Sequence, residues 1–299
     1  MELSSIFSSI TDVEFGEQVD LTSYSTFKLK ARGDLLIVKS LPALQKSVEA
    51  LTKHQTPYTV LGLGANQIIK SQPDSLYLKL ELPLASDILA KCQSSYLLPA
   101  SILLNQLTSH AIKYGLKGWE VFTGIPATLG GAVCMNAGTS LGEIASLVKK
   151  VYIVKSSGEL YELEVKPEHF EYRSNLFLSQ GDVIYAVEMI HNGEDAKISD
   201  LIKEYLQNRR ASQPLDKRTC GCIFKNYIVE EKTCRAGHYI DIVGLKGLTF
   251  DGMRVSPVHG NFFENVDGAT DRDVMALINM VRDELKLQFG VEFEKEVKL

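Results

Sequence analysis

The chain has 299 residues, of which 45% are hydrophobic and 23% charged, the usual composition of a globular protein with two domains or so. Its formal net charge of −5 argues against a general nucleic-acid-binding protein, which would carry a basic surface. The sequence has no run of about twenty apolar residues and no basic N-terminal segment followed by an apolar stretch, so we expect neither a transmembrane helix nor a signal peptide.

The five cysteines have no framework spacing, so we expect reduced thiols in a cytoplasmic protein. Cys220, Cys222, Cys234 and His238 carry atoms that can bind zinc, but their spacing matches no standard zinc site. We therefore predict no metal.

The first part of the chain predicts strands around one helix. We expect a short helix and a lead-in over residues 1–20. An alternating run predicts a strand over residues 22–32, with a second short strand at 36–38. Apolar residues at helical spacing predict a helix over 41–54. Residues 58–66 predict a strand that runs into a glycine turn.

That turn reads G-L-G-A-N, from Gly62 to Asn66. A G-x-G sequence taken alone is ordinarily a structural turn. It lacks the third glycine and the downstream acidic residue of the dinucleotide-binding fingerprint, so we predict no Rossmann fold.

The middle of the chain predicts strands and turns over residues 76–104 and then a helix over 103–114, which ends at Gly115. A helix-like run follows at 140–148. Two strands around a Ser-Gly turn are expected over 151–163.

Between these elements, residues 124–138 read G-I-P-A-T-L-G-G-A-V-C-M-N-A-G. Glycine permits close approach and unusual dihedral angles, so the backbone N–H groups of this segment can cradle an anion, above all a phosphate. A tight crossing between a strand and a helix is the alternative. Together with the turn at Gly62, two separated cradles suit a long dinucleotide such as FAD.

Arg173 lies among three aromatic residues in H-F-E-Y-R-S-N-L-F. A lone arginine is normally a surface charge. Here the aromatic neighbours favour a charge aimed inward, where the planar fork suits a carboxylate or phosphate. The residues alone leave both alternatives open.

The last third begins with an amphipathic helix over 197–210, which the following Q-P-L breaks. We place a domain boundary there. Residues 220–226 read C-G-C-I-F-K-N and combine a thiol, a cation and an amide, although a buried structural thiol is the ordinary interpretation of a cysteine. Residues 244–263 are glycine-rich, and residues 271–289 predict a helix.

An alternating strand is expected after that helix, with Glu292, Glu294 and Glu296 on one face. Three carboxylates on one face would normally be solvated.

These motifs, in this order, resemble those of the UDP-N-acetylenolpyruvoylglucosamine reductases, which are FAD enzymes of peptidoglycan precursor synthesis. The resemblance covers nearly the whole chain. It is carried by the segment at 124–138, Y-R-S at 172–174, Q-P-L followed by G-C-I-F-K-N, G-L-K-G, V-S-P-V-H-G-N-F and the closing F-G-V-E-F-E-K-E-V.

The resemblance implies an α+β fold. A two-subdomain FAD-binding fold of the vanillyl-alcohol-oxidase type is followed by an α+β domain that binds the UDP-sugar. We assign residues 1–75 and 76–200 to the two FAD-binding subdomains and residues 201–299 to the substrate domain, with the last strand returning toward the active site. The short spacing between Arg173 and Cys222 indicates the shorter branch of the family, without an extra substrate-capping loop.

The site residues follow from the positions that match. The implied catalytic residues are Arg173, Cys222 (the proton donor) and Glu296. We assign cofactor contacts to both glycine segments and one arginine: Gly62, Gly64, Ala65, Asn66, Gly124, Ile125, Pro126, Thr128, Gly130, Gly131, Asn136, Ala137, Gly138 and Arg209. The substrate contacts are assigned to Tyr172, Lys225, Asn226, Ser256, His259 and Asn261.

The sequence departs from the family pattern at the proton donor, where Cys222 stands in place of the usual serine. A free thiol has a pKa of about 8.5 and is a stronger acid than a serine hydroxyl, so this change is compatible with the role. Three further departures, at residues 30–34, Ala127 and Tyr227, weaken no chemical role.

The implied reaction is the NADPH-dependent, FAD-mediated reduction of UDP-N-acetylglucosamine enolpyruvate to UDP-N-acetylmuramate. We expect a monomer that binds a UDP-sugar and neither nucleic acid nor membrane. Two alternatives are another FAD-dependent oxidoreductase of the same fold, disfavoured because no residue stands out for covalent flavin attachment, and a non-catalytic nucleotide-sugar-binding relative.

Overall fold

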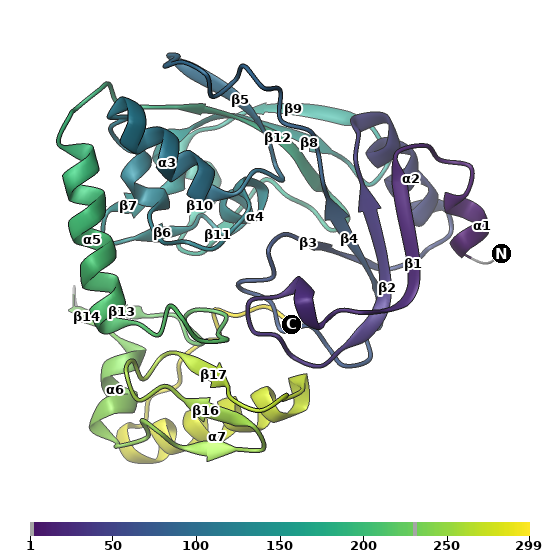
Figure 1. Ribbon diagram of the computed structural model, residues 1–299. Coiled ribbons are helices and arrows are strands. Elements are labelled where there is room, and N and C mark those ends of the chain that lie inside the picture. The colour runs from purple at the N-terminus through teal and green to yellow at the C-terminus, as the bar shows by residue number, and fades with distance from the viewer. Residues whose placement is uncertain (1–2, 230–231) are drawn as a thin grey trace. The chain divides into compact units, whose positions relative to one another are not determined.

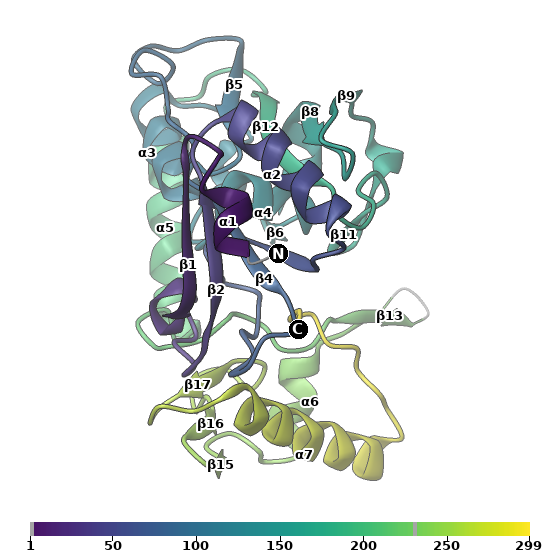
Figure 2. The same cartoon turned by 90° about the vertical axis from the view of Figure 1, so that its right-hand side faces the viewer.

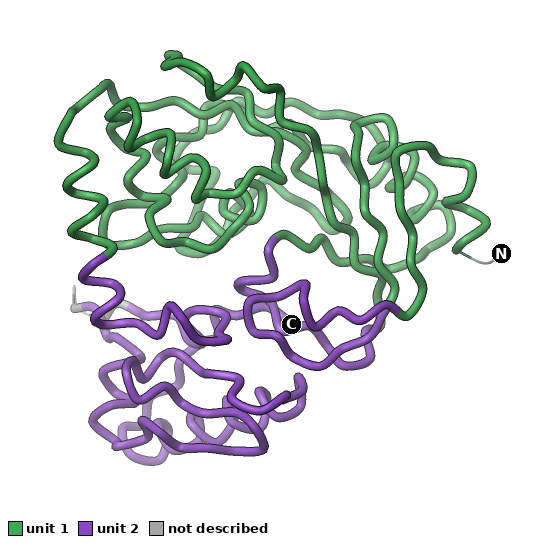
Figure 3. The backbone as a smooth tube through the Cα atoms, in the orientation of Figure 1, with its two compact units in different colours: residues 1–18, 34–62, 74–206 green, residues 19–33, 63–73, 207–299 purple. Residues whose placement is uncertain are grey.

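The computed structural model describes residues 3–229 and 232–299 and divides into two compact units (Figure 3). Each unit is assembled from three separate stretches of chain. Unit 1 contains residues 1–18, 34–62 and 74–206, and unit 2 contains residues 19–33, 63–73 and 207–299.

The first sheet of unit 1 has four strands in the order β1-β2-β4-β3, and β4 runs parallel to both β2 and β3. Its strands are β1 (Val13–Asp20), β2 (Arg32–Val38), β3 (Tyr58–Leu61) and β4 (Leu76–Leu80). The helix α2 (Leu41–Lys53) begins after Ser40, whose side chain accepts a hydrogen bond from the Ala43 N–H. Leu44, Val48 and Leu51 form its buried face. The short α1 (Leu3–Phe7) lies beside α2 (Figure 2).

The second sheet of unit 1 is antiparallel, in the order β5-β12-β8-β9 (Figure 1). Its strands are β5 (Ser95–Pro99), β8 (Val148–Val154), β9 (Leu160–Glu164) and β12 (Val183–Ile190). Two helices, α3 (Leu104–Tyr114) and α4 (Leu129–Cys134), share its hydrophobic core. Trp119 is fully buried in that core and donates a hydrogen bond through Nε1 to the Ile190 carbonyl over 2.8 Å.

Two small hairpins complete the part of unit 1 that carries predicted site residues. They are β6 (Gly138–Thr139) with β7 (Gly142–Glu143), and β10 (Phe170–Glu171) with β11 (Ser174–Asn175). The described residues also contain the 3₁₀ helices η2 (Trp119–Phe122), η3 (Ile144–Leu147) and η4 (Pro167–His169) in unit 1 and η1 (Thr22–Tyr24) in unit 2. The helix α5 (Ile198–Ser212) begins in unit 1 and ends in unit 2.

Unit 2 packs its hairpin, small sheet and helices around a separate core. Its elements are β13 (Tyr227–Val229) with β14 (Lys232–Cys234), the antiparallel sheet β15 (Thr249–Phe250), β16 (Met253–Val255) and β17 (Phe263–Asn265), α6 (Ala236–Ile242) and α7 (Asp271–Phe289). Phe27, Leu29 and Ile68 belong to the same core as the apolar stripe of α7. Among the helices of the described residues, none is both long and apolar enough to cross a bilayer.

Three of the expected elements were wrong. Of residues 22–32, only Arg32 belongs to a strand, as the first residue of β2; the rest form none, because Lys28 has a positive φ of 54° and the carbonyls of Phe27 and Lys28 accept hydrogen bonds from the Asn265 side chain. Residues 140–148 form β7 and η3 in place of a helix. The expected strand after α7 reduces to single bridges at Lys295 and Lys298, because each pairs with a different loop.

Candidate active site

The two glycine segments meet in unit 1. Thr128 caps α4, and its Oγ1 accepts a hydrogen bond from the Gly131 N–H over 3.3 Å. A Cβ added to Gly62 would lie only 2.8 Å from that same Oγ1. The turn that follows β3 and the start of α4 therefore approach as closely as the missing side chain of Gly62 allows.

Some backbone N–H groups of the glycine-rich segment form hydrogen bonds within the protein. The N–H groups of Leu129 and Gly130 donate to the carbonyls of Ile102 and Ala100, each over 2.8 Å. A Cβ at Gly130 would lie 2.8 Å from the Ala100 Cβ. The expectation of exposed amides along the whole segment was therefore too broad. The cofactor contact expected for Gly130 stays a prediction.

The turn after β3 continues into unit 2, where it holds the end of the chain. Gly64 has a φ of 64°, and a Cβ there would lie 2.4 Å from the Tyr24 carbonyl oxygen. Asn66 Nδ2 donates to the Glu296 carbonyl over 3.1 Å, and the Lys298 N–H donates to the Asn66 carbonyl over 3.0 Å. Asn66 thus fixes the segment that carries Glu296.

In unit 2, Cys222 and Glu296 lie on neighbouring segments. Cys222 is half-buried and forms a bridge with Phe262. The Glu296 N–H donates to the carbonyl of Ile223, the residue next to Cys222, over 2.8 Å. Burial raises the pKa of the neighbouring Cys220 thiol, and negative charge on Cys222 and Glu296 raises it further. The backbone hydrogen bond between Glu296 and Ile223 therefore places the segments of two predicted catalytic residues, far apart in sequence, side by side.

The carboxylates of the last segment differ in environment. Glu292 and Glu294 are exposed, and they form ion pairs with Lys286 and Lys225 over 3.3 and 3.1 Å. Glu296 is half-buried. The expected strand placed all three carboxylates on one solvated face, whereas Glu296 is less exposed than the other two; its catalytic role stays a prediction.

In unit 1, the Arg173 side chain is 17% exposed. Its Nη2 donates to the Gly138 carbonyl over 3.0 Å, and its Nη1 lies 3.7 Å from Glu143 Oε1. Its guanidinium carbon lies 4.7 Å from the centroid of the Tyr172 ring. Tyr172 itself is 44% exposed. Of the two alternatives, the inward-facing arginine is confirmed, while its catalytic role stays a prediction.

Two residues of the glycine-rich segment, Asn136 and Ala137, contribute to this part of unit 1. Asn136 is buried, and both of its side-chain N–H groups are engaged, with Glu143 Oε2 over 2.8 Å and the Glu171 carbonyl over 3.1 Å. The Ala137 carbonyl accepts from the Ile144 N–H. Gly124, Ile125 and Pro126 range from half-buried to exposed.

The predicted substrate residues of unit 2 lie mostly in hydrogen-bonded turns. Asn226 Oδ1 accepts from the Ala236 N–H over 3.1 Å. Asn261 is buried; its Oδ1 accepts from the Phe224 N–H and its Nδ2 donates to the Phe224 carbonyl. Ser256 is fully buried, and its hydroxyl accepts from the Val258 N–H. Ser256 and Asn261 thus shape the fold, and their contact with a substrate stays a prediction.

Two further predicted residues, His259 and Arg209, are also held locally. Burial lowers the pKa of His259, and the charge of Lys246 lowers it further. Arg209 donates through Nε and Nη2 to Gln213 Oε1 over 2.9 and 2.7 Å. The cofactor contact expected for Arg209 likewise stays a prediction.

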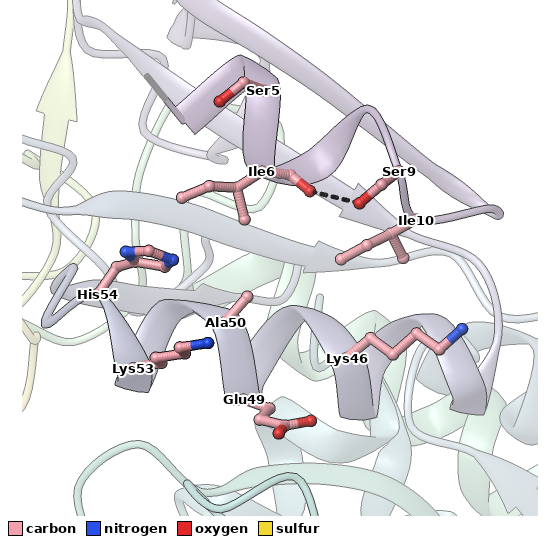
Figure 4. A pocket seen from close by; sticks show the side chains of 9 residues that line it. All are labelled: Ser5, Ile6, Ser9, Ile10, Lys46, Glu49, Ala50, Lys53 and His54. Carbon is pink, nitrogen blue, oxygen red and sulfur yellow. Dashed lines mark hydrogen bonds between the residues drawn. The ribbon is translucent and has the colours of Figure 1, made fainter. Parts of the chain in front are cut away.

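A cavity of about 450 Å³ lies between α1 and α2, away from every predicted site residue. Figure 4 shows Ile6 and Ile10 facing α2, which contributes Lys46, Lys53 and, after its end, His54. Within the described residues, no group of three or more His, Cys, Asp or Glu side chains could hold a metal ion.

Sequence reasoning missed Glu143 as a possible functional residue. It belongs to no motif that was singled out, and its proximity to Arg173 depends on the pairing of β6 with β7. Only the neighbouring glycine-rich segment pointed to this part of the chain.

Two family models match the chain. The model described as the C-terminal domain of UDP-N-acetylenolpyruvoylglucosamine reductase matches residues 213–299, and an FAD binding domain matches residues 35–164. These matches confirm the expected order of an FAD-binding region followed by a second α+β domain.

Relatives and a solved structure match most of the chain. The UDP-N-acetylenolpyruvoylglucosamine reductase of Bacillus pumilus (strain SAFR-032) is 31% identical, with 95% of this chain and 93% of the relative covered. That of Anaeromyxobacter dehalogenans (strain 2CP-C) is 37% identical, with 86% and 76% covered. The crystal structure of UDP-N-acetylenolpyruvylglucosamine reductase (MurB) from Thermus caldophilus matches with a TM-score of 0.78 and 30% identity, covering 96% of this chain and 98% of that one.

Proposed function

Because this chain belongs to the UDP-N-acetylenolpyruvoylglucosamine reductase family, we propose that it reduces the enolpyruvyl double bond of UDP-N-acetylglucosamine enolpyruvate to the lactyl group of UDP-N-acetylmuramate. This is a step of peptidoglycan precursor synthesis. The observation that carries the proposal is the pairing of the Cys222 and Glu296 segments through the Glu296–Ile223 hydrogen bond. In the proposed reaction the thiol on one of these segments would donate a proton, and the carboxyl group on the other would share a proton with the substrate.

The residues fit FAD as the cofactor. Gly62 lets the turn after β3 approach the Thr128 hydroxyl at the start of α4 more closely than a residue with a Cβ could, as a cradle built from two loops requires. The groups proposed to hold FAD are those of the turn after β3 and of the segment around α4. The chemistry that FAD supplies when bound is the transfer of hydride from NADPH to C3 of the substrate double bond.

The chain's own residues would manage the charge and the proton. Addition of hydride at C3 develops negative charge at C2, which spreads into the substrate carboxylate. The Arg173 guanidinium would bind that carboxylate and stabilise the charge. Glu296 would assist in its protonated form, since two adjacent anions repel. The Cys222 thiol would donate its proton to C2, and the thiolate would regain a proton from solvent.

The test uses the purified protein loaded with FAD. NADPH consumption is followed by absorbance with and without UDP-N-acetylglucosamine enolpyruvate, and the product is identified by mass spectrometry. We expect consumption that depends on the sugar and a product heavier by two hydrogen atoms. Consumption that is unchanged by the sugar and depends on oxygen would contradict the proposal. We also propose a cytoplasmic location, since NADPH is supplied inside the cell.

A further inference from the structure

Arg173 has a backbone conformation that arginine rarely adopts. Tyr172 and Arg173 form the two-residue loop between β10 and β11, in which Glu171 pairs with Ser174. Arg173 has a φ of 57°, in the left-handed region, where such turns ordinarily carry glycine or asparagine. A bulky side chain kept in a strained turn indicates that the side chain itself is needed there.

One pair of residues in the neighbouring hairpin holds the guanidinium. Gly138 and Glu143 lie directly opposite each other in the β6–β7 pairing. The Gly138 carbonyl accepts from Arg173 Nη2, and Glu143 Oε1 faces Arg173 Nη1. The guanidinium carbon lies over the Tyr172 ring. The fork therefore has a hydrogen bond at Nη2, an ion pair at Nη1 and an aromatic ring beside it, and these three contacts restrict its orientation.

The Glu143 carboxylate is itself held in place. Its other oxygen, Oε2, accepts from Asn136 Nδ2 over 2.8 Å. Asn136 also donates to the Glu171 carbonyl and accepts from the Ala145 N–H over 3.3 Å, so it ties the two hairpins together. Asn175 reinforces the link through a hydrogen bond from its Nδ2 to the Cys134 carbonyl over 2.8 Å.

We propose that Glu143, oriented by Asn136, is a positioning residue that aims the Arg173 guanidinium at the substrate carboxylate. The inference rests on the proposed function, because it takes the ligand of Arg173 to be that carboxylate. Glu143 acts through Arg173 and not by contact with the substrate. A guanidinium already held in one plane loses less conformational freedom when the carboxylate binds.

The test compares two ligands by calorimetry on the FAD-loaded protein. UDP-N-acetylmuramate carries the carboxylate, and UDP-N-acetylglucosamine does not. Glu143→Gln preserves the size of the side chain and an acceptor for Asn136 but removes the charge. We expect it to weaken binding of UDP-N-acetylmuramate about fivefold, as is reasonable for a partly exposed ion pair, and to leave UDP-N-acetylglucosamine unchanged.

The matched control is Glu171→Gln, which removes an exposed carboxylate from the hairpin that carries Arg173 and should change neither affinity. Glu143→Gln should also have no further effect in the Arg173→Ala background, since its action requires the guanidinium. Urea unfolding of each variant checks that the fold is kept.

Three results would overturn the inference. They are unchanged or tighter binding of UDP-N-acetylmuramate by Glu143→Gln, equal weakening of both ligands, or an undiminished effect in the absence of Arg173. If the wild-type protein turns over the enolpyruvyl sugar while any of these is found, only the inference fails. A wild-type protein that neither binds the ligands nor consumes NADPH with the sugar overturns the proposed function and this inference with it.

Discussion

The backbone N–H of Glu296 donates to the carbonyl of Ile223, the residue that follows Cys222. This bond joins the end of the chain to the loop that carries the thiol. Asn66 secures the same segment from its other side through the Glu296 carbonyl. Hydrogen bonds to backbone atoms therefore hold the segments that carry the carboxyl and the thiol, so we expect substitution of either side chain to leave these bonds in place.

Substitution of Cys222 separates the two halves of the proposed reaction. We expect Cys222→Ser to keep substantial activity, since a hydroxyl can also donate a proton. Cys222→Ala should slow reduction of the enolpyruvyl sugar by about 10²–10⁴, the usual contribution of a positioned acid. Stopped-flow absorbance of the flavin measures each half alone, and reduction by NADPH should be unaffected in both variants. Wild-type turnover by Cys222→Ala would exclude the thiol as proton donor.

Gly62→Ala should lower the flavin content of the purified protein. The added methyl group would lie 2.8 Å from Thr128 Oγ1, so the turn after β3 would have to move away from α4. The ratio of flavin to protein absorbance measures the effect. Thr128→Ala removes the clashing atom, and the double variant should recover part of the flavin lost by Gly62→Ala alone. Full flavin content in Gly62→Ala would show that this approach is not needed for binding.

At position 173, a glycine variant should be more stable than an alanine variant, which is the reverse of the usual order. The positive φ costs an L-residue about 1–2 kcal/mol and costs glycine nothing, so Arg173→Gly should be more stable than Arg173→Ala by about 1 kcal/mol. Both variants should lose activity, because both lack the guanidinium. Urea unfolding at equilibrium gives the difference, and a more stable alanine variant would mean that the turn holds no strain.

Unfolding at mildly acidic pH should depend on His259. Burial lowers the pKa of this imidazole below its usual 6.5, with Lys246 lowering it and Asp241 opposing the shift. The unfolded chain therefore takes up the proton first, and stability is present above pH 6.5 and lost as the pH falls through the lower, folded-state pKa.

A variant comparison isolates this contribution. His259→Gln should lose less stability than the wild type between pH 7.5 and about pH 5, as measured by urea unfolding. His54→Gln, at an exposed histidine, should follow the wild type. Parallel pH profiles for His259→Gln and the wild type would contradict the assignment.

Local patterns predicted the regular elements well. The apolar spacing that indicated α2 and α7 reflects a buried stripe, whereas α5 buries Ile198 and Ile202 and leaves Leu201 exposed. Gly115 ends α3 in the left-handed conformation expected of a C-cap. The strand over 22–32 failed because its backbone groups pair with the Asn265 side chain and other loops. Such partners lie far away in sequence and leave no periodic signal.

The candidate site was predictable to a smaller extent. Family motifs pointed to Arg173, Cys222 and Glu296, and the structure places the last two on neighbouring segments of unit 2. No motif indicated Glu143, whose closeness to Arg173 arises from the pairing of two hairpins. The burial of Ser256 and Asn261 could not be predicted from the sequence either, because burial depends on the folded surroundings and not on residue type.

Phe27, Leu29 and Ile68 complete a core whose other members all lie between Cys220 and Val297. During synthesis on the ribosome, these three side chains therefore cannot pack into their native core until the residues between Cys220 and Val297 have emerged. A fragment cloned from residue 213 onward would lack all three side chains and leave their places in that core empty.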